Sequence, residues 1–169
     1  MPLTSAITAH DKRWPSLFKQ QAARLDPAFG SACHALHHVG STAVEGLSAK
    51  PEIDVLAVVS RADQLHEWTK ALRLLGYRRG GDLSAGHHFF KRDVDGVRTH
   101  KLHVCVSGHA IVLRMLRIRD HLRTHAEDRA AYQALKSRLE RSNTIGIAEY
   151  LQGKTPFLDT LYQKIQIGP

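Results

Sequence analysis

Residues 37–59 read HHVGSTAVEGLSAKPEIDVLAVV, and this stretch decides the fold. Its last third, within Glu52–Val59, is continuously apolar and β-branched, which is typical of a central, buried strand. Pro51 keeps the residue before it extended and therefore suits the approach to that strand. Upstream, Cys33–Val39 predicts another strand, and Gly40 then opens a loop with room for one helical turn. The sequence thus predicts two successive strands joined by a loop that begins with glycine and serine.

Helical and strand patterns flank this centre on both sides. Apolar residues recur at helical spacing, and two more strands are joined by Asp95-Gly96, a strong hairpin signal. The elements expected on these grounds span residues 10–29 (helix), 63–75 (helix), 87–92 (strand) and 97–106 (strand). After Gly108 the pattern is helical, and Pro156 is expected to kink or divide the last helix. We predict one α+β domain over residues 1–169, with the sheet in about residues 1–107 and a helical tail over 108–169.

Composition limits the class of protein and its partners. The 169 residues are 43% apolar and 24% charged, as in an ordinary globular domain. No apolar run approaches the roughly 18–20 residues of a membrane span, no signal peptide is recognisable, and two cysteines supply no disulfide framework. We therefore expect a cytoplasmic protein with no membrane partner. The net charge of +8 favours anionic partners such as nucleotides; nucleic acid has weak support, because no Lys/Arg-rich block is present.

Two pairs of residues in the central stretch carry chemistry. Gly40-Ser41 follows a strand and precedes a helical turn, so backbone N–H groups and a hydroxyl are free to hold phosphate oxygens. Glu52 and Asp54 are two positions apart, and on a strand this spacing places both carboxylates on one face. Such a pair binds a hard cation such as Mg²⁺, which would bridge nucleotide phosphates. Alone, each pair is more often a turn or a solvated face; together they predict a phosphate and metal site.

The same residues resemble a known family. The run 37–59 is similar to the signature of the GrpB family, also called UPF0157, which usually reads H-(I/V)-G-S-T-(A/S)-V-x-G-L-x-A-K-P-x-(I/V)-D. Further segments that resemble this family are THKLHV at 99–104, the predicted helix pair at 118–140, and YLQGK at 150–154 with Phe157. The resemblance covers nearly the whole chain. It implies a nucleotidyltransferase-like mixed sheet, as in the polymerase-beta-like superfamily, with an N-terminal helix and a C-terminal helical tail.

The resemblance also implies roles for individual residues. Gly40 and Ser41 match the phosphate-binding turn, and Glu52 and Asp54 match the metal pair. Thr42, the next residue of the turn, is a further candidate for phosphate binding. Three lysines at family-like positions are candidates to complete the phosphate pocket, although each is about as well explained as a surface lysine: Lys50, Lys136 and Lys154.

One departure concerns the third carboxylate that active superfamily members usually carry on a later strand. The matching strand here, Val97–Val106, offers His100 and His103 instead. His100 shares a face with Leu102, and His103 lies on the opposite face. A histidine there is either a general base, a metal ligand or an ordinary strand residue, and His103 is the stronger candidate for the site.

These observations leave two hypotheses of function. In the first, the protein is a nucleotidyltransferase that depends on Mg²⁺ or Mn²⁺ and transfers a nucleoside monophosphate from a nucleoside triphosphate to an unknown acceptor, with His103 as the proton acceptor. In the second, it is a nucleotide- or CoA-binding module that has lost the chemistry. The missing third carboxylate favours the second hypothesis, and the intact pair Glu52 and Asp54 favours the first by a narrow margin.

Overall fold

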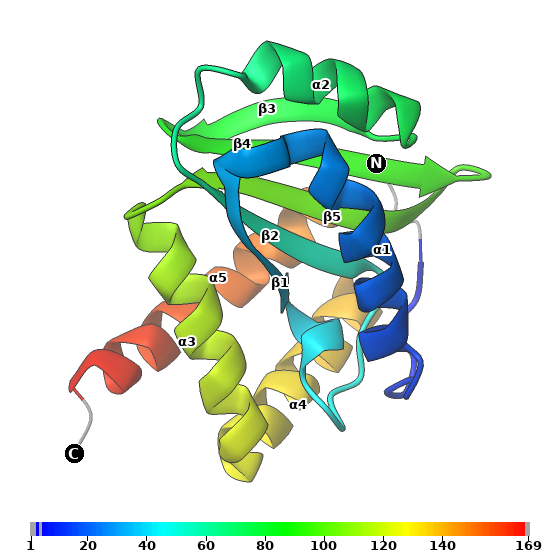
Figure 1. The fold of residues 1–169 in the computed structure, drawn as a ribbon. Coiled ribbons are helices and arrows are strands. Elements are labelled where there is room, and N and C mark those ends of the chain that lie inside the picture. The colour runs from blue at the N-terminus through cyan, green and yellow to red at the C-terminus, as the bar shows by residue number, and fades with distance from the viewer. Residues whose placement is uncertain (1–2, 4, 168–169) are drawn as a thin grey trace.

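The computed structural model describes residue 3 and residues 5–167, which form a five-stranded sheet with helices on both faces (Figure 1). In chain order the elements are α1 (Trp14–Phe29), the 3-10 turn η1 (Gly30–Ala32), β1 (Cys33–Val39), the 3-10 turn η2 (Ser41–Ala43), β2 (Ile53–Val59), α2 (Leu65–Leu74), β3 (Arg78–Ser84), β4 (His87–Val94), β5 (Val97–Val106), α3 (Ala110–Thr124), α4 (Ala126–Ser142) and α5 (Ile147–Ile167). This arrangement confirms the predicted α+β fold class.

The sheet is mixed, and its strand order is β1-β2-β5-β4-β3. Strands β2 and β5 run parallel, whereas β1 with β2, β5 with β4 and β4 with β3 are antiparallel. The register of the central parallel pair sets Asp54 beside Lys101 and Leu56 beside His103. Because side chains alternate along a strand, Asp54, Lys101 and His103 all lie on the same face of the sheet.

The two faces of the sheet bury different sets of residues. On one face, apolar residues of β2 and β5 such as Val55 and Leu102 form the main core with the aromatic residues Trp14 of α1 and Trp68 of α2. On the other face, a smaller cluster joins Leu56 and neighbouring strand residues to α3. The tail helices α3, α4 and α5 gather on this second side of the sheet (Figure 1). The face that carries Asp54 is therefore the one that the helical tail covers.

A third cluster connects the tail to the loop between β1 and β2. Val44 and Leu47 of that loop pack against apolar residues of the tail helices, among them Tyr132. Gly153 allows a close approach of α5 to α4, because a Cβ atom at this position would lie only 2.5 Å from the Leu139 Cδ2 atom. The helical tail is thereby held against the loop that begins at Gly40.

Several sequence-based expectations need correction. Strand β2 begins at Ile53, so Glu52 precedes the strand instead of opening it. Strand β3 was not expected: it is an exposed edge strand that contains Gly80-Gly81, and such a composition lacks the apolar alternation that identifies strands. Pro156 does not divide the last helix, because α5 runs continuously through it. Among the described residues, none of the helices combines the length and the apolar character that a membrane crossing requires.

Candidate functional site

Gly40 brings the main chain into direct contact with the Asp54 carboxylate. Its backbone angles, φ 72° and ψ −172°, lie in a region that is essentially restricted to glycine. A Cβ atom on residue 40 would lie 2.3 Å from the Asp54 Oδ2 atom, well inside any tolerable contact. The pairing of Val39 with Asp54 across β1 and β2 sets this approach. The turn predicted as a phosphate-binding element therefore begins directly beside the predicted acidic residue.

Thr42 fastens the turn to the residue that precedes β2. The Thr42 hydroxyl donates to the main-chain carbonyl of Glu52 at 3.1 Å, and the Thr42 Oγ1 atom is 3.0 Å from the His38 Nε2 atom. Since the hydroxyl hydrogen is used for Glu52, His38 is the donor in the second contact. Both side chains are buried. Thr42, a candidate phosphate ligand by sequence, is thus engaged within the protein, while Ser41 lines the neighbouring cavity.

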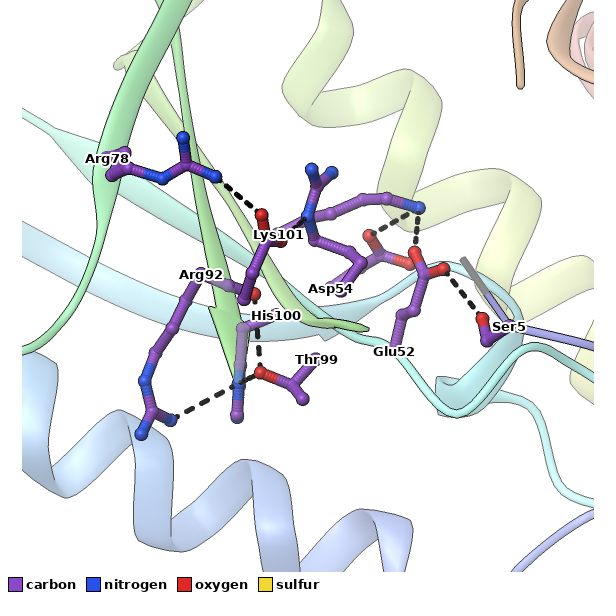
Figure 2. Close-up of polar contacts among 10 residues, drawn as sticks. Ser5, Glu52, Asp54, Arg78, Arg92, Thr99, His100 and Lys101 are labelled. Atoms are coloured by element: carbon purple, nitrogen blue, oxygen red, sulfur yellow. Dashed lines mark hydrogen bonds and ion pairs between the residues drawn. The ribbon is translucent and has the colours of Figure 1, made fainter. Parts of the chain in front are cut away.

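Glu52 and Asp54 meet a lysine that the sequence analysis did not select. The Lys101 Nζ atom of β5 lies 2.6 Å from Glu52 Oε2 and 3.9 Å from Asp54 Oδ1 (Figure 2). The second oxygen of Glu52 accepts a hydrogen bond from the Ser5 hydroxyl at 3.2 Å. The three side chains of the group are only 6% (Glu52), 19% (Asp54) and 25% (Lys101) exposed. A partly buried carboxylate–lysine–carboxylate group therefore occupies the centre of the site.

Burial and neighbouring charges shift the pKa values of Lys101 and Asp54. Burial disfavours the charged form of Lys101, but Asp54 and Glu52 outweigh burial and raise the pKa of its ammonium group. Burial raises the pKa of Asp54, against the opposing effect of Lys101, and the charge of Glu52 raises it further. The lysine is therefore positively charged at neutral pH, and the carboxylates depend on it for compensation.

Two further lysines flank the aromatic ring of Tyr150 near the same group. The Nζ atoms of Lys50 and Lys154 lie 4.5 Å and 4.7 Å from the ring centroid. Burial, together with the positive charge of Lys101, lowers the pKa of Lys154 to about 8. Lys154 lines the cavity described next, and Lys50 does not.

A cavity of about 470 Å³ opens between the sheet and the helical tail. Its polar end is formed by Gly40, Ser41, Asp54, Lys101 and Lys154. Its remaining wall is mostly apolar and comes largely from α3 and α5, with Ile111, Met115, Ile118, Leu151 and Leu158. A concave, mainly apolar site with a few convergent polar groups is the usual form of a small-molecule site.

Positive charge dominates the lining of this cavity. Of the described residues on its surface, Asp54 is the one carboxylate, whereas four side chains are cationic: Lys101, Arg114, Arg119 and Lys154. The two arginines also bind acidic residues of α3 and α5, and Arg119 donates to the His38 carbonyl at 3.0 Å. The sequence analysis did not select Arg119 as a residue of the site. Its position on the cavity follows from the packing of α3 across the end of β1, which the sequence does not specify.

His103 lies in the cavity, but its chemistry differs from that of a ready general base. The His103 Nδ1 and His87 Nε2 atoms are 2.8 Å apart. Burial, together with the charges of His87 and Lys101, lowers the pKa of His103 to about 3, so the ring is a weak proton acceptor. His100, the weaker candidate, packs near Tyr77 on the opposite face of the sheet.

Lys136 does not reach the cavity. Its amine donates to the main-chain carbonyl of Ser48, and the side chain is buried at 2% exposure. The Lys136 Nζ atom lies 5.0 Å from the centroid of the Tyr132 ring. Burial, followed by the charge of Lys154, lowers the pKa of this amine to about 7. The structure thus gives Lys136 a place in holding α4 against the loop that precedes β2.

The residues present do not suit a divalent metal ion. Across residues 3 and 5–167, no three His, Cys, Asp or Glu side chains gather closely enough to hold one. Mg²⁺ requires near-octahedral oxygen coordination, and the neighbour of Asp54 on β5 is a cationic lysine instead of a third carboxylate. The Lys101 ammonium group already lies against Glu52, where a cation would bind.

Sequence comparisons relate the chain to one family of proteins. The GrpB family model, described as GrpB protein, matches residues 4–164. UPF0157 protein YqkA of Bacillus subtilis is 31% identical over 155 residues, and this match covers 91% of the chain but 45% of YqkA. A UPF0157 protein of Halalkalibacterium halodurans is 33% identical over 168 residues, which cover 96% of the chain and 84% of that protein. The chain therefore spans less than half of YqkA and most of the second relative.

Solved structures extend the comparison to the fold. Conserved protein GrpB from Enterococcus faecalis superimposes with a TM-score of 0.87 at 25% identity, covering 95% of this chain and 96% of that one. The Cid1 poly(U) polymerase in its form with Mg 3'-dATP bound gives a TM-score of 0.58 at 11% identity, over 87% of this chain and 49% of that chain. At that identity the likeness establishes a shared nucleotidyltransferase-like fold.

Proposed function

Because the chain belongs to the GrpB family and has a nucleotidyltransferase-like fold, we propose that it binds a nucleotide, or a related phosphorylated molecule such as CoA, in the cavity beside Gly40. The observation that carries this proposal is the composition of the cavity: one carboxylate faces four cationic side chains at the polar end and along the wall. An excess of positive charge in a concave site concentrates anionic ligands. The apolar remainder of the wall suits a base or another flat, weakly polar group.

Different residues of the cavity are placed to contact different parts of the ligand. Lys154 is cationic below about pH 8 and is available at the cavity surface to contact a phosphate. The Ser41 hydroxyl and the N–H groups of the turn after Gly40 are further donors at the same end. Met115, on the apolar wall that α3 provides, offers a soft apolar contact to the rest of the ligand.

Transfer of a nucleoside monophosphate from a nucleoside triphosphate to an acceptor is the second candidate function. The contact between the Gly40 turn and Asp54 favours it, because the sequence motif predicted a phosphate turn beside an acidic residue. Two observations weigh against it: Lys101 lies where Mg²⁺ or Mn²⁺ would bind between Glu52 and Asp54, and His103 is a weak base. Binding without transfer is therefore the function that the geometry supports best.

A thermal-shift panel tests the proposal, because a ligand that binds only the folded state raises its melting temperature. ATP, GTP, CTP, UTP and CoA are each added with Mg²⁺, with Mn²⁺ and with EDTA. We expect at least one of them to stabilise the protein in EDTA, and a ligand at about 100 times its Kd contributes about 2.7 kcal/mol. The Lys154→Met variant should lose this stabilisation, whereas Lys164→Met, which removes an exposed lysine paired with Asp128, should keep it.

Each of the other outcomes has a definite meaning. If no ligand stabilises the protein, or if Lys154→Met responds as the wild type does, the proposed binding site is wrong. Release of pyrophosphate that requires a divalent metal and is lost in Asp54→Asn would establish the transferase instead.

A further inference from the structure

We propose that Lys101 is the resident cation of the Glu52–Asp54 site and that it makes the site independent of divalent metal. The proposal concerns the cation position itself; only its consequence for phosphate binding rests on the function proposed above. Three features of the structure support it: the position of the ammonium group, the engagement of the carboxylate oxygens, and the local balance of charge.

The position of Lys101 follows from the register of the sheet. Strands β2 and β5 are parallel neighbours, and Lys101 is the direct partner of Asp54. Its side chain extends from there toward Glu52, so that its Nζ atom lies 2.6 Å from one carboxylate and 3.9 Å from the other (Figure 2). A metal ion that used both carboxylates would need the space that this ammonium group fills.

The oxygens of Glu52 already have partners within the protein, and those of Asp54 lie close to Lys101 and Gly40. On Glu52, Oε2 binds Lys101 and Oε1 accepts the Ser5 hydroxyl. On Asp54, Oδ1 faces Lys101 and Oδ2 lies against Gly40. A Cβ atom added to Gly40 would lie only 2.3 Å from this Oδ2 atom. A divalent ion would therefore have to displace Lys101 from Glu52 and fit beside Gly40 before it could use both carboxylates.

Charge balance points in the same direction. The two negative charges of Glu52 and Asp54 are matched by Lys101 and by Lys154, whose charges both act on Asp54. A bound divalent ion would add two positive charges beside Lys101 and Lys154, and close like charges at a partly buried site repel strongly. Lys101 supplies one positive charge at a fixed place and Lys154 a second, which together balance the two carboxylates, so an incoming phosphate meets cations that need no metal.

Glu52 gains a role from this arrangement that differs from metal binding. It holds the Lys101 amine through a short ion pair while the Ser5 hydroxyl fixes its own second oxygen. Glu52 is therefore a positioning residue for the lysine. The sequence predicted that Glu52 binds a metal ion; in the structure Glu52 orients the Lys101 ammonium group, which takes the place of that ion.

Binding of Mn²⁺ alone to the full chain tests the proposal without any nucleotide. Loss of the free Mn²⁺ signal in electron paramagnetic resonance reports the bound ion. We expect no saturable binding by the wild type at submillimolar Mn²⁺. The Lys101→Asp variant removes the resident charge and adds a carboxylate beside Asp54. We expect it to bind one Mn²⁺ at least about tenfold more tightly than the wild type does. A change of one unit charge within about 4 Å of an ion is expected to change its dissociation constant by more than about tenfold. Adding Asp54→Asn to that variant should abolish the gain.

The matched control is Lys164→Met, which breaks an exposed lysine–carboxylate pair with Asp128 and should gain no Mn²⁺ binding. Circular dichroism checks that each variant is folded. Saturable Mn²⁺ binding by the wild type that Asp54→Asn removes would overturn the proposal, and this measurement does not depend on the folding of any Lys101 variant. A folded Lys101→Asp variant that binds no Mn²⁺ would also overturn it. Because neither result involves a nucleotide, each can be told apart from a failure of the proposed ligand binding.

Discussion

Replacement of Gly40 by alanine tests the contact on which the polar end of the cavity depends. At φ 72° and ψ −172°, an L-residue carries backbone strain of about 1–3 kcal/mol. The added Cβ atom would also lie 2.3 Å from Asp54 Oδ2 and 3.0 Å from Asp54 Cγ, so the carboxylate must move. Overpacking of this kind costs about 1–3 kcal/mol more. We expect Gly40→Ala to lower the free energy of unfolding by about 4 kcal/mol, which is a fall in Tm of about 8–16 °C for a chain of this size.

Gly30 provides a matched control for the backbone term alone. Its angles, φ 56° and ψ −143°, are similar, and a Cβ atom there would meet nothing within 4 Å. Gly30→Ala should therefore cost about 2 kcal/mol, through strain without a clash. Urea denaturation followed by circular dichroism measures both variants on the same scale.

A double-mutant cycle then isolates the contact with Asp54. In an Asp54→Ala background the Oδ2 and Cγ atoms are absent, so Gly40→Ala should cost about 1–2 kcal/mol less than it does in the wild type. Equal costs for Gly40→Ala and Gly30→Ala, with no coupling to Asp54, would refute the close approach of the turn to the carboxylate. The proposed phosphate pocket would then lose its geometric basis.

Two predictions concern pH. The pKa of Lys154 is lowered to about 8, so its charge is lost as the pH rises through that value, and affinity for a phosphorylated ligand should fall by at most about tenfold per pH unit above it. In isothermal titration, the weaker residual binding of Lys154→Met should show no such fall. The buried Lys136 amine has a folded-state pKa of about 7, against 10.5 for the exposed amine of the unfolded chain. Between these two pH values the unfolded chain binds one proton more than the folded protein, so the free energy of unfolding rises with pH. The rise is up to about 1.4 kcal/mol per pH unit. Urea midpoints from pH 7 to pH 9 should show this rise in the wild type and a smaller one in Lys136→Met; parallel profiles would contradict the burial of a neutral amine.

The central strands were predictable because local pattern and burial agree there. The run Ile53–Val59 is apolar, and six of its seven residues are buried in the structure. The edge strand β3 was not predictable in the same way, since its register with β4 is irregular and its side chains are largely exposed. Glycine is required at position 80 because the Phe89 ring of β4 packs against it: a Cβ atom on residue 80 would lie 2.8 Å from the Phe89 Cδ1 atom. The sequence alone does not show this contact.

The sequence predicted most directly those site residues that lie near one another in the chain, between Gly40 and Asp54. Alternation along β5 places Lys101 and His103 on one face, but which of them lies beside Asp54 depends on the register of two parallel strands. Sequence reasoning preferred His103 because histidine serves as a base. The register selects Lys101, and the paired charge on Glu52 explains how a lysine is tolerated at a partly buried position. Lys136 follows the same logic, because only the packing of α4 brings its amine to the Ser48 carbonyl.

The resident lysine also bears on the form in which a phosphorylated ligand would bind. A nucleotide in solution with Mg²⁺ has part of its phosphate charge neutralised, so it presents less negative charge to Lys101 and Lys154 than the free nucleotide does. With Lys101 fixed against Glu52, the site cannot recover that loss by coordinating the metal through its own carboxylates. The wild-type protein should therefore bind the free nucleotide more tightly than the Mg²⁺ complex, and excess Mg²⁺ should weaken binding in isothermal titration. Tighter binding with Mg²⁺ would show that the metal enters with the ligand and that Lys101 gives way to it.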